Sequence, residues 1–249
     1  MQKVLILNKN KGETPLACME RFRAANPEYL SIPMTYAGRL DPIAEGVLVV
    51  LAGEEVHKKV DYLGLDKEYV ARLLLGFSSD TYDVLGIGDG GSGPVPPRSE
   101  IEKTLTLQIG TRDEPYPPYS SKTVRGKPLF LWAREGALDA VEIPTHQIKV
   151  YDAVLEDLSL VGSSELYSEI ESTVVKVAGD FRQEEILKKW RSLLDENKKY
   201  AVLTVRYRVS SGTYIRSLAH ALGATHGMGA VLLSLIRTRV GEYSLADHT

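Results

Sequence analysis

A single carboxylate lies in an otherwise small and apolar stretch in the first third of the chain. Asp41 comes three residues after Gly38 and is followed directly by Pro42. A residue before proline is pushed towards extended or turn conformations, and Val47–Leu51 has the composition of a buried strand. The sequence therefore predicts a lone carboxylate on a stiff loop that leads into the core, where catalytic groups are often found. The alternative is an ordinary Asp-Pro turn, in which the aspartate caps its own backbone.

Apolar periodicity and turn residues predict the elements that must hold this loop. Strands are expected at Val4–Leu7, Val47–Leu51, Lys67–Gly76 and Tyr200–Val209, and helices at Pro15–Ala25, Ser99–Leu107, Gln183–Glu196 and Tyr214–Leu222. Thr14 is the expected N-cap of the first helix, with Pro15 at its first position. Ile87–Pro97 is rich in glycine and proline and is predicted to be a loop. Because no clear boundary interrupts this order, we expect a single domain over residues 1–249.

The charged residues are unevenly distributed along the 249-residue chain, whose formal net charge is −3. Residues 201–240 contain five arginines and no acidic residue, and residues 119–134 contain four basic residues and no acidic one. Basic segments of this kind favour a surface that binds phosphate groups. The alternative is that the arginines pair with acids from other segments of the chain.

Cysteine and histidine content argues against metal sites and disulfides. The chain has one cysteine, Cys18, and its five histidines, including the near-terminal His248, lack the spacing of metal ligands. We therefore expect no metal and no cofactor. The apolar stretch at the N-terminus is too short for a signal peptide, and no apolar run approaches the roughly 20 residues that span a bilayer. These features predict a soluble cytoplasmic protein without a membrane partner.

The stretch around Asp41 resembles the signature loop of TruB-type pseudouridine synthases, in which a glycine, Leu-Asp-Pro and a second glycine precede an apolar strand. Four further segments are similar to motifs of this family, in the family's order and across nearly the whole chain. They lie within Leu7–Thr14, Lys67–Gly86, Pro118–Gly136 and Ser211–Gly241. The resemblance implies an α+β pseudouridine-synthase fold, with a central mixed, mainly antiparallel sheet flanked by helices and loops.

The resemblance also implies roles for individual residues. It makes Asp41 the catalytic carboxylate, Arg216 its cationic partner, and Tyr69 the platform for a flipped-out uridine and a participant in proton removal. The residues implied to contact the RNA or the flipped base are Lys9, Tyr36, Gly38, Arg39, Lys122, Arg125, Lys127, Leu235 and Arg237. The plain alternatives are a phosphate contact or surface pair for Arg216, and core packing for Tyr69 and Leu235.

By the same resemblance we expect an enzyme that isomerises a uridine of RNA, with the T-loop of tRNA as substrate, acting as a monomer without a protein partner. The chain departs from the family pattern at Tyr36, where a histidine is usual, at Glu45, where threonine is usual, and at Asn10, where proline is usual. We also expect no C-terminal RNA-binding domain.

Two other functions are consistent with the sequence. One is a non-enzymatic RNA-binding or RNA-folding protein that keeps the pocket for its shape. The other is a carboxylate-dependent glycosidase or hydrolase, which would need a second carboxylate near Asp41. Glu45 and Asp83 are the nearby candidates in the sequence.

Overall fold

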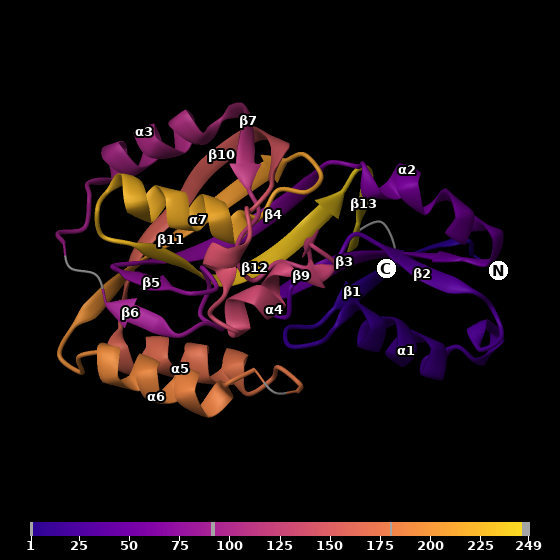
Figure 1. Cartoon of the computed structure of the whole chain (residues 1–249), viewed down its shortest axis with the longest axis horizontal. Helices are drawn as coiled ribbons and strands as arrows, with labels where there is room; N and C mark the ends of the chain where they lie inside the picture. Colours follow the sequence, from indigo (N-terminus) through magenta and orange to yellow (C-terminus); the bar gives the residue numbers. More distant parts are fainter. Residues whose placement is uncertain (1, 91–92, 180, 246–249) are drawn as a thin grey trace.

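A large mixed sheet forms the centre of the molecule (Figure 1), in a computed structural model that describes residues 2–90, 93–179 and 181–245. The sheet has nine strands in the order β1-β3-β12-β4-β11-β10-β7, with β2 paired to β3 and β13 paired to β12. Strands β12 and β3 run parallel, and the other pairs are antiparallel. The expected fold class, a mainly antiparallel mixed sheet flanked by helices, is confirmed. The predicted loop residues 91–92 and His248 lie outside the described residues.

The elements have the following bounds. The strands of the large sheet are β1 (Val4–Lys9), β2 (Met34–Ala37), β3 (Ala44–Ala52), β4 (Lys67–Leu75), β7 (Gly110–Pro115), β10 (Thr145–Gly162), β11 (Lys199–Val209), β12 (Ala230–Val240) and β13 (Tyr243–Ser244). Two small hairpins pair β5 (Phe77–Ser79) with β6 (Gly88–Gly90) and β8 (Thr123–Val124) with β9 (Lys127–Pro128). The helices are α1 (Pro15–Ala25), α2 (Lys59–Leu63), α3 (Arg98–Gln108), α4 (Leu129–Arg134), α5 (Ser163–Val174), α6 (Gln183–Leu193) and α7 (Ile215–Thr225).

The main core forms where α3, α5, α6 and α7 pack on the central strands. Each of these helices contributes apolar side chains to one continuous cluster, among them Ile101, Ile170, Trp190 and Leu222. A smaller cluster lies between α1 and the strands β1, β2 and β3 at the N-terminal end of the molecule (Figure 1). The loop that carries Asp41 connects β2 to β3, and it therefore lies between the main core and this smaller cluster.

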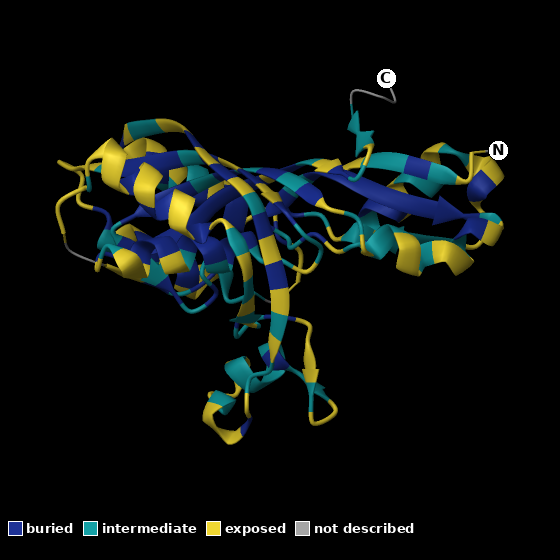
Figure 2. Ribbon diagram, turned by 90° about the horizontal axis from the view of Figure 1, so that it is seen from above, coloured by how far each residue is buried: buried dark blue, intermediate teal, exposed yellow. Residues whose placement is uncertain are grey.

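Residues 116–144 form a lobe that protrudes from the sheet (Figure 2). The lobe begins and ends at paired positions, because Pro115 of β7 lies opposite Thr145 of β10. It carries the hairpin β8–β9 and the helix α4. The stretch Pro118–Gly136, which resembles a family motif, lies within this lobe.

Most of the predicted elements are confirmed with small shifts in their bounds. Helix α1 has the predicted limits, and the Thr14 hydroxyl caps it by accepting a hydrogen bond from the Ala17 amide at 3.0 Å. The predicted loop at Ile87–Pro97 is wrong at its start, where β6 pairs with β5. Strands β10 and β12 and helix α5 were not predicted. In the part of the chain that the structure describes, no helix is both long and apolar enough to cross a bilayer.

Gly46 lets β3 and β12 approach closely beside the loop that carries Asp41. Its φ is +102°, and a Cβ there would overlap the carbonyl oxygen of Arg237. We expect Gly46→Ala to lower the free energy of unfolding by about 3 kcal/mol or more, because strain and overlap add. Gly53→Ala is the matched control, since Gly53 also has a positive φ but no atom lies near its Cβ position, and it should cost only about 1 kcal/mol. Urea unfolding of both variants checks this, and equal losses would contradict it.

Candidate active site

Two buried cations hold the backbone of the loop that carries Asp41. The Lys9 ammonium donates to the carbonyls of Ala44 at 2.5 Å and Asp41 at 3.4 Å. The Arg237 guanidinium donates to the carbonyls of Val47 at 2.7 Å and Arg39 at 3.2 Å. Both ends of the loop are thus fixed to β1 and β12, so the position of the Asp41 side chain is set by the core of the molecule.

These contacts correct the expectation for Lys9 and add a structural role for Arg237. Lys9 is fully buried, and its ammonium is used by loop carbonyls, so it does not contact substrate in this arrangement. Arg237 is also buried and donates to loop carbonyls, although it borders the cavity described below. Both cations thus position the loop, and Arg237 also borders the cavity.

Burial lowers the pKa of Lys9 from 10.5 to about 8. Between these values the unfolded chain binds more protons than the folded one, so this lysine makes the free energy of unfolding rise with pH across that window. We therefore expect the free energy of unfolding of the wild type, relative to that of Lys9→Met, to rise as pH increases from 8 to about 10. Urea unfolding of both proteins at several pH values measures this difference, and a difference that does not change with pH would contradict it.

Asp41 and Arg216 form an ion pair, with Oδ2 of Asp41 3.1 Å from Nε of Arg216. The arginine also donates from Nη1 to the Thr81 carbonyl at 2.8 Å and from Nη2 to the Tyr119 carbonyl at 3.0 Å. Its side chain is 4% exposed, whereas that of Asp41 is 43% exposed. A fixed guanidinium therefore holds a carboxylate whose other side faces solvent.

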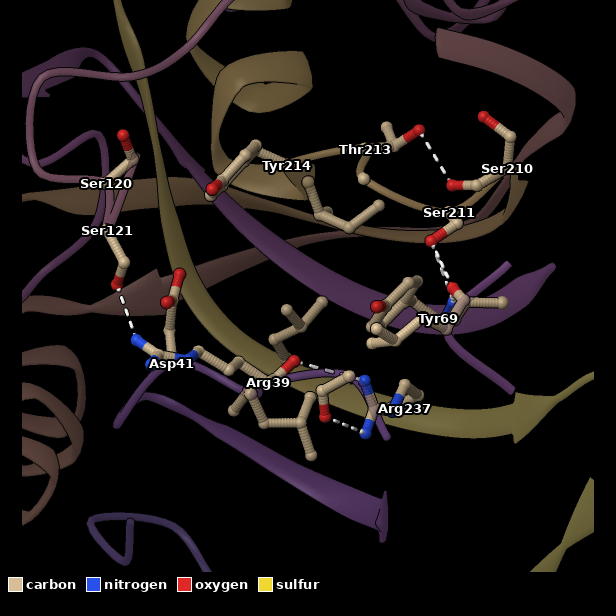
Figure 3. A pocket seen from close by; sticks show the side chains of 18 of the residues that line it. Arg39, Asp41, Tyr69, Ser120, Ser121, Ser210, Ser211, Thr213, Tyr214 and Arg237 are labelled. Carbon is tan, nitrogen blue, oxygen red and sulfur yellow. Dashed lines mark hydrogen bonds between the residues drawn. The ribbon is translucent and has the colours of Figure 1, made fainter. Parts of the chain in front are cut away.

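The exposed side of Asp41 borders a cavity of about 270 Å³. Tyr69 of β4 and Leu235 of β12 contribute to its apolar wall, and both are largely buried. The lining also includes Tyr116 and the turn Ser210–Tyr214, which precedes α7. Figure 3 shows Asp41 on one side of this cavity, Tyr69 on the other and Tyr214 on the wall between them. The predicted residues Asp41, Tyr69, Gly38, Arg39 and Leu235 are thus brought together.

The residues that match the TruB family pseudouridylate synthase (N terminal domain) are 32–215, which include this loop, the cavity wall on β4 and the turn before α7. The chain belongs to the TruB family. The tRNA pseudouridine synthase B of Protochlamydia amoebophila (strain UWE25) is 30% identical over 249 residues, covering 99% of this chain and 77% of that protein. The protein of the same name from Oleidesulfovibrio alaskensis is 32% identical and covers 98% of this chain.

The chain is shorter than several of these family members. It spans 65% of the Oleidesulfovibrio protein and 64% of the tRNA pseudouridine synthase B of Syntrophus aciditrophicus (strain SB). Among solved structures, the crystal structure of a Cbf5-Nop10-Gar1 complex aligns with a TM-score of 0.58 at 22% identity, covering 98% of this chain and 50% of that one. This likeness shows that the family fold extends over nearly all of this chain.

Three residues that sequence reasoning did not assign, Lys67, Tyr116 and Tyr214, also line this cavity. The Lys67 ammonium donates to the carbonyls of Leu63 at 2.8 Å and Leu65 at 2.5 Å, and burial lowers its pKa to about 8. Tyr116 and Tyr214 line the cavity. A signal for Lys67 was present, because Lys67 and Tyr69 are two apart on a strand and so share a face.

The basic residues of the lobe lie at different distances from the cavity. The Lys122 ammonium is 5.0 Å from the ring centroid of Tyr116, so it lies close to the cavity wall. Arg125, at the tip of the β8–β9 hairpin, donates to the Ala140 carbonyl at 3.2 Å. Lys127 pairs with Glu135 on the lobe itself. Of Lys122, Arg125 and Lys127, Lys122 is therefore the one that contacts a residue of the cavity wall.

Tyr36 lies on β2, outside the lining of the cavity that Asp41 borders. It packs against the cluster under α1, and the Lys59 ammonium lies 5.4 Å from its ring centroid. The residues that line the cavity begin at Gly38. The RNA contact expected for Tyr36 stays a prediction.

Several arginines of residues 201–240 pair with acids from other segments, as the alternative interpretation of the charge pattern predicted. Arg206 lies 3.0 Å from Glu156, and Arg239 lies 3.8 Å from Glu68. These pairs partly neutralise the expected basic face.

A glycosidase would need a second carboxylate near Asp41, and Asp83 is one of the two candidates. It is buried, accepts a hydrogen bond from the Thr81 hydroxyl at 2.6 Å, and burial raises its pKa to about 6. Glu45, the other candidate, lies on β3 opposite Ile236 of β12. Among the residues with described positions, no group of three His, Cys, Asp or Glu side chains could hold a metal ion.

Proposed function

We propose that this protein is a tRNA pseudouridine synthase in which Asp41 is the catalytic carboxylate. The observation that carries the proposal is the pair between the exposed Asp41 carboxylate and the buried Arg216 guanidinium at the edge of a base-sized cavity. Membership of the TruB family and the names of the curated relatives support the same reaction. Residues 1–249 would act as one catalytic domain and as a monomer.

The reaction needs only groups that this site supplies. Isomerisation breaks the bond between N1 and C1′, forms one between C5 and C1′, releases the C5 proton to solvent and leaves a proton on N1. A carboxylate such as Asp41 can assist by attack on the ring or at the sugar, and both routes require it to be held against the reacting atoms. Arg216 balances the negative charge of Asp41 and orients it through a fixed donor geometry.

The target uridine must leave its base stack to reach Asp41. Extrusion costs a few kcal/mol, and stacking on an aromatic side chain returns part of that cost. Tyr69 offers such a surface within the cavity, and Leu235 closes the apolar side. The T-loop of the tRNA T-arm is the proposed substrate, with Lys122 positioned to meet its backbone near the cavity mouth.

Tritium release from RNA labelled at uridine C5 tests the proposal. We expect the wild type to release tritium from tRNA transcripts, with the new pseudouridine mapped to the T-loop, and Asp41→Ala to release none. Binding of tRNA without release would favour the non-enzymatic RNA-binding function. Release of free uracil would instead favour the glycosidase function, because an isomerase keeps the base attached to the RNA.

A further inference from the structure

One acceptor of the Arg216 guanidinium comes from a loop in which the next residue has an unusual backbone conformation. Residues 80–87 connect β5 to β6, and the carbonyl of Thr81 in this loop accepts from Nη1 of Arg216 at 2.8 Å. The next residue, Tyr82, has a φ of +66°. This left-handed conformation is uncommon for a residue other than glycine, and it persists only where surrounding contacts hold it.

The φ of Tyr82 sets the direction of the Thr81 carbonyl. The carbonyl of Thr81 and the amide of Tyr82 belong to one planar peptide unit, so a change in the φ of Tyr82 turns both groups together. In the structure the amide donates to the Ser79 carbonyl at 3.2 Å, while the carbonyl accepts from Arg216. Relaxation of Tyr82 to a negative φ would therefore turn the Thr81 carbonyl away from the guanidinium.

The ring of Tyr82 is held by a histidine of α7. The imidazole of His220 stacks on this ring, with the two centroids 3.9 Å apart and the planes 13° apart. Arg216 and His220 are four residues apart on the helix, so they lie on the same face, one turn from each other. Helix α7 thus contacts two consecutive residues of the β5–β6 loop, the Thr81 carbonyl through Arg216 and the Tyr82 ring through His220.

We propose that His220 is a positioning residue for the isomerisation of uridine, which holds the Tyr82 ring and thereby keeps the Thr81 carbonyl on Arg216. The inference rests on the proposed function, because Arg216 in turn orients Asp41. His220 lies outside the lining of the cavity that Asp41 borders, so it acts through the loop. Burial lowers the pKa of His220, so its ring is neutral at pH 7 and adds no charge beside the ion pair.

Tritium release from tRNA, measured as kcat and KM for His220→Ala and His220→Phe, tests the inference. His220→Ala removes the stack, and we expect it to lower kcat about tenfold at unchanged KM, because Arg216 keeps its bond to Asp41 but loses a fixed orientation. His220→Phe keeps a flat ring against Tyr82 and should retain kcat within about twofold of the wild type. If His220→Ala fails to fold, His220→Leu fills the same space without a flat ring and takes its place.

A double-mutant cycle separates this role from general destabilisation. Tyr82→Ala should lower kcat by a similar factor, and its combination with His220→Ala should lower kcat no further, because both changes remove the same stack. His226→Ala is the matched control. His226 follows the C-terminal end of α7, and its Nε2 lies 3.0 Å from the Thr104 hydroxyl, so its loss should leave kcat and KM unchanged.

Any of four results would overturn the inference. The first two are a wild-type kcat for His220→Ala and an equal loss for His220→Ala and His220→Phe, since the ring stack would then not matter. The third is a double variant in which the two losses add. The fourth is a rise in KM at unchanged kcat, which would make His220 part of RNA binding. Absence of tritium release by the wild type would instead refute the proposed function itself, and this outcome is visible before any variant is made.

Discussion

Replacing Asp41 by asparagine should abolish pseudouridine formation while leaving the fold and RNA binding intact. Asparagine has nearly the same shape, and its amide oxygen can accept the bond that Arg216 Nε now donates at 3.1 Å. Because the Asp41 side chain is 43% exposed, the change leaves little buried polar surface unpaired. The loss of turnover should be at least about 10⁴-fold, as for removal of a group that touches the reacting atoms.

Single-turnover tritium release, with RNA affinity measured in parallel, checks this expectation. Glu45→Gln is the matched control, since it removes a carboxylate four residues away on β3 and should leave turnover within about twofold. A residual rate within tenfold of the wild type, or a loss of RNA affinity as large as the loss of turnover, would rule out the catalytic role of Asp41. A similar fall in Glu45→Gln would point to the glycosidase-like pair of carboxylates.

The loop around Asp41 could be predicted because its determinants are local. Pro42 restricts the residue before it, and Gly38 adopts a φ of +87°, which favours glycine. The apolar run that follows gives β3, and the Thr14–Pro15 pair gives the start of α1. Each of these signals acts over a few residues, so no knowledge of the tertiary fold was needed.

The roles of Lys9 and Arg237 could not be predicted from their neighbours in the sequence. A cation in a motif suggests a phosphate contact, yet both side chains are buried among loop carbonyls. Lys9 donates to the carbonyl of its neighbour Asn10, but its partners on the Asp41 loop are 32 and 35 residues away, and those of Arg237 are 190 or more residues away. Only the parallel pairing of β12 with β3 brings Arg237 to the loop.

The packing of Tyr36 and the stacking of His220 show the same limit. Which face of β2 packs on α1 depends on the register of β2 with β3, where Tyr36 lies opposite Val50. Helix α7 was predicted, but the contact of His220 with Tyr82 depends on how this helix packs beside the β5–β6 loop. Local patterns thus predict the loop that carries Asp41, whereas the contacts that support it follow from tertiary pairing.

Arg216→Lys should reduce turnover by roughly 10²- to 10³-fold and lower the free energy of unfolding by about 1–3 kcal/mol. The guanidinium bonds at once to Asp41 and to the carbonyls of Thr81 and Tyr119. A single ammonium on a flexible stem keeps the charge but cannot reach three acceptors arranged around a planar group. At least one carbonyl would therefore lose its donor, and Asp41 would lose its fixed orientation.

Arg206→Lys provides the control for this change, because Arg206 pairs with Glu156 on an exposed face and such pairs contribute about 1 kcal/mol or less. Urea unfolding and tritium release on both variants separate the two effects. If Arg216→Lys is destabilised but turns over at the wild-type rate, Arg216 only clamps the β5–β6 loop and the lobe. A lower kcat at unchanged RNA affinity is the expected result, since the arginine orients the carboxylate and the cavity that receives the base stays formed.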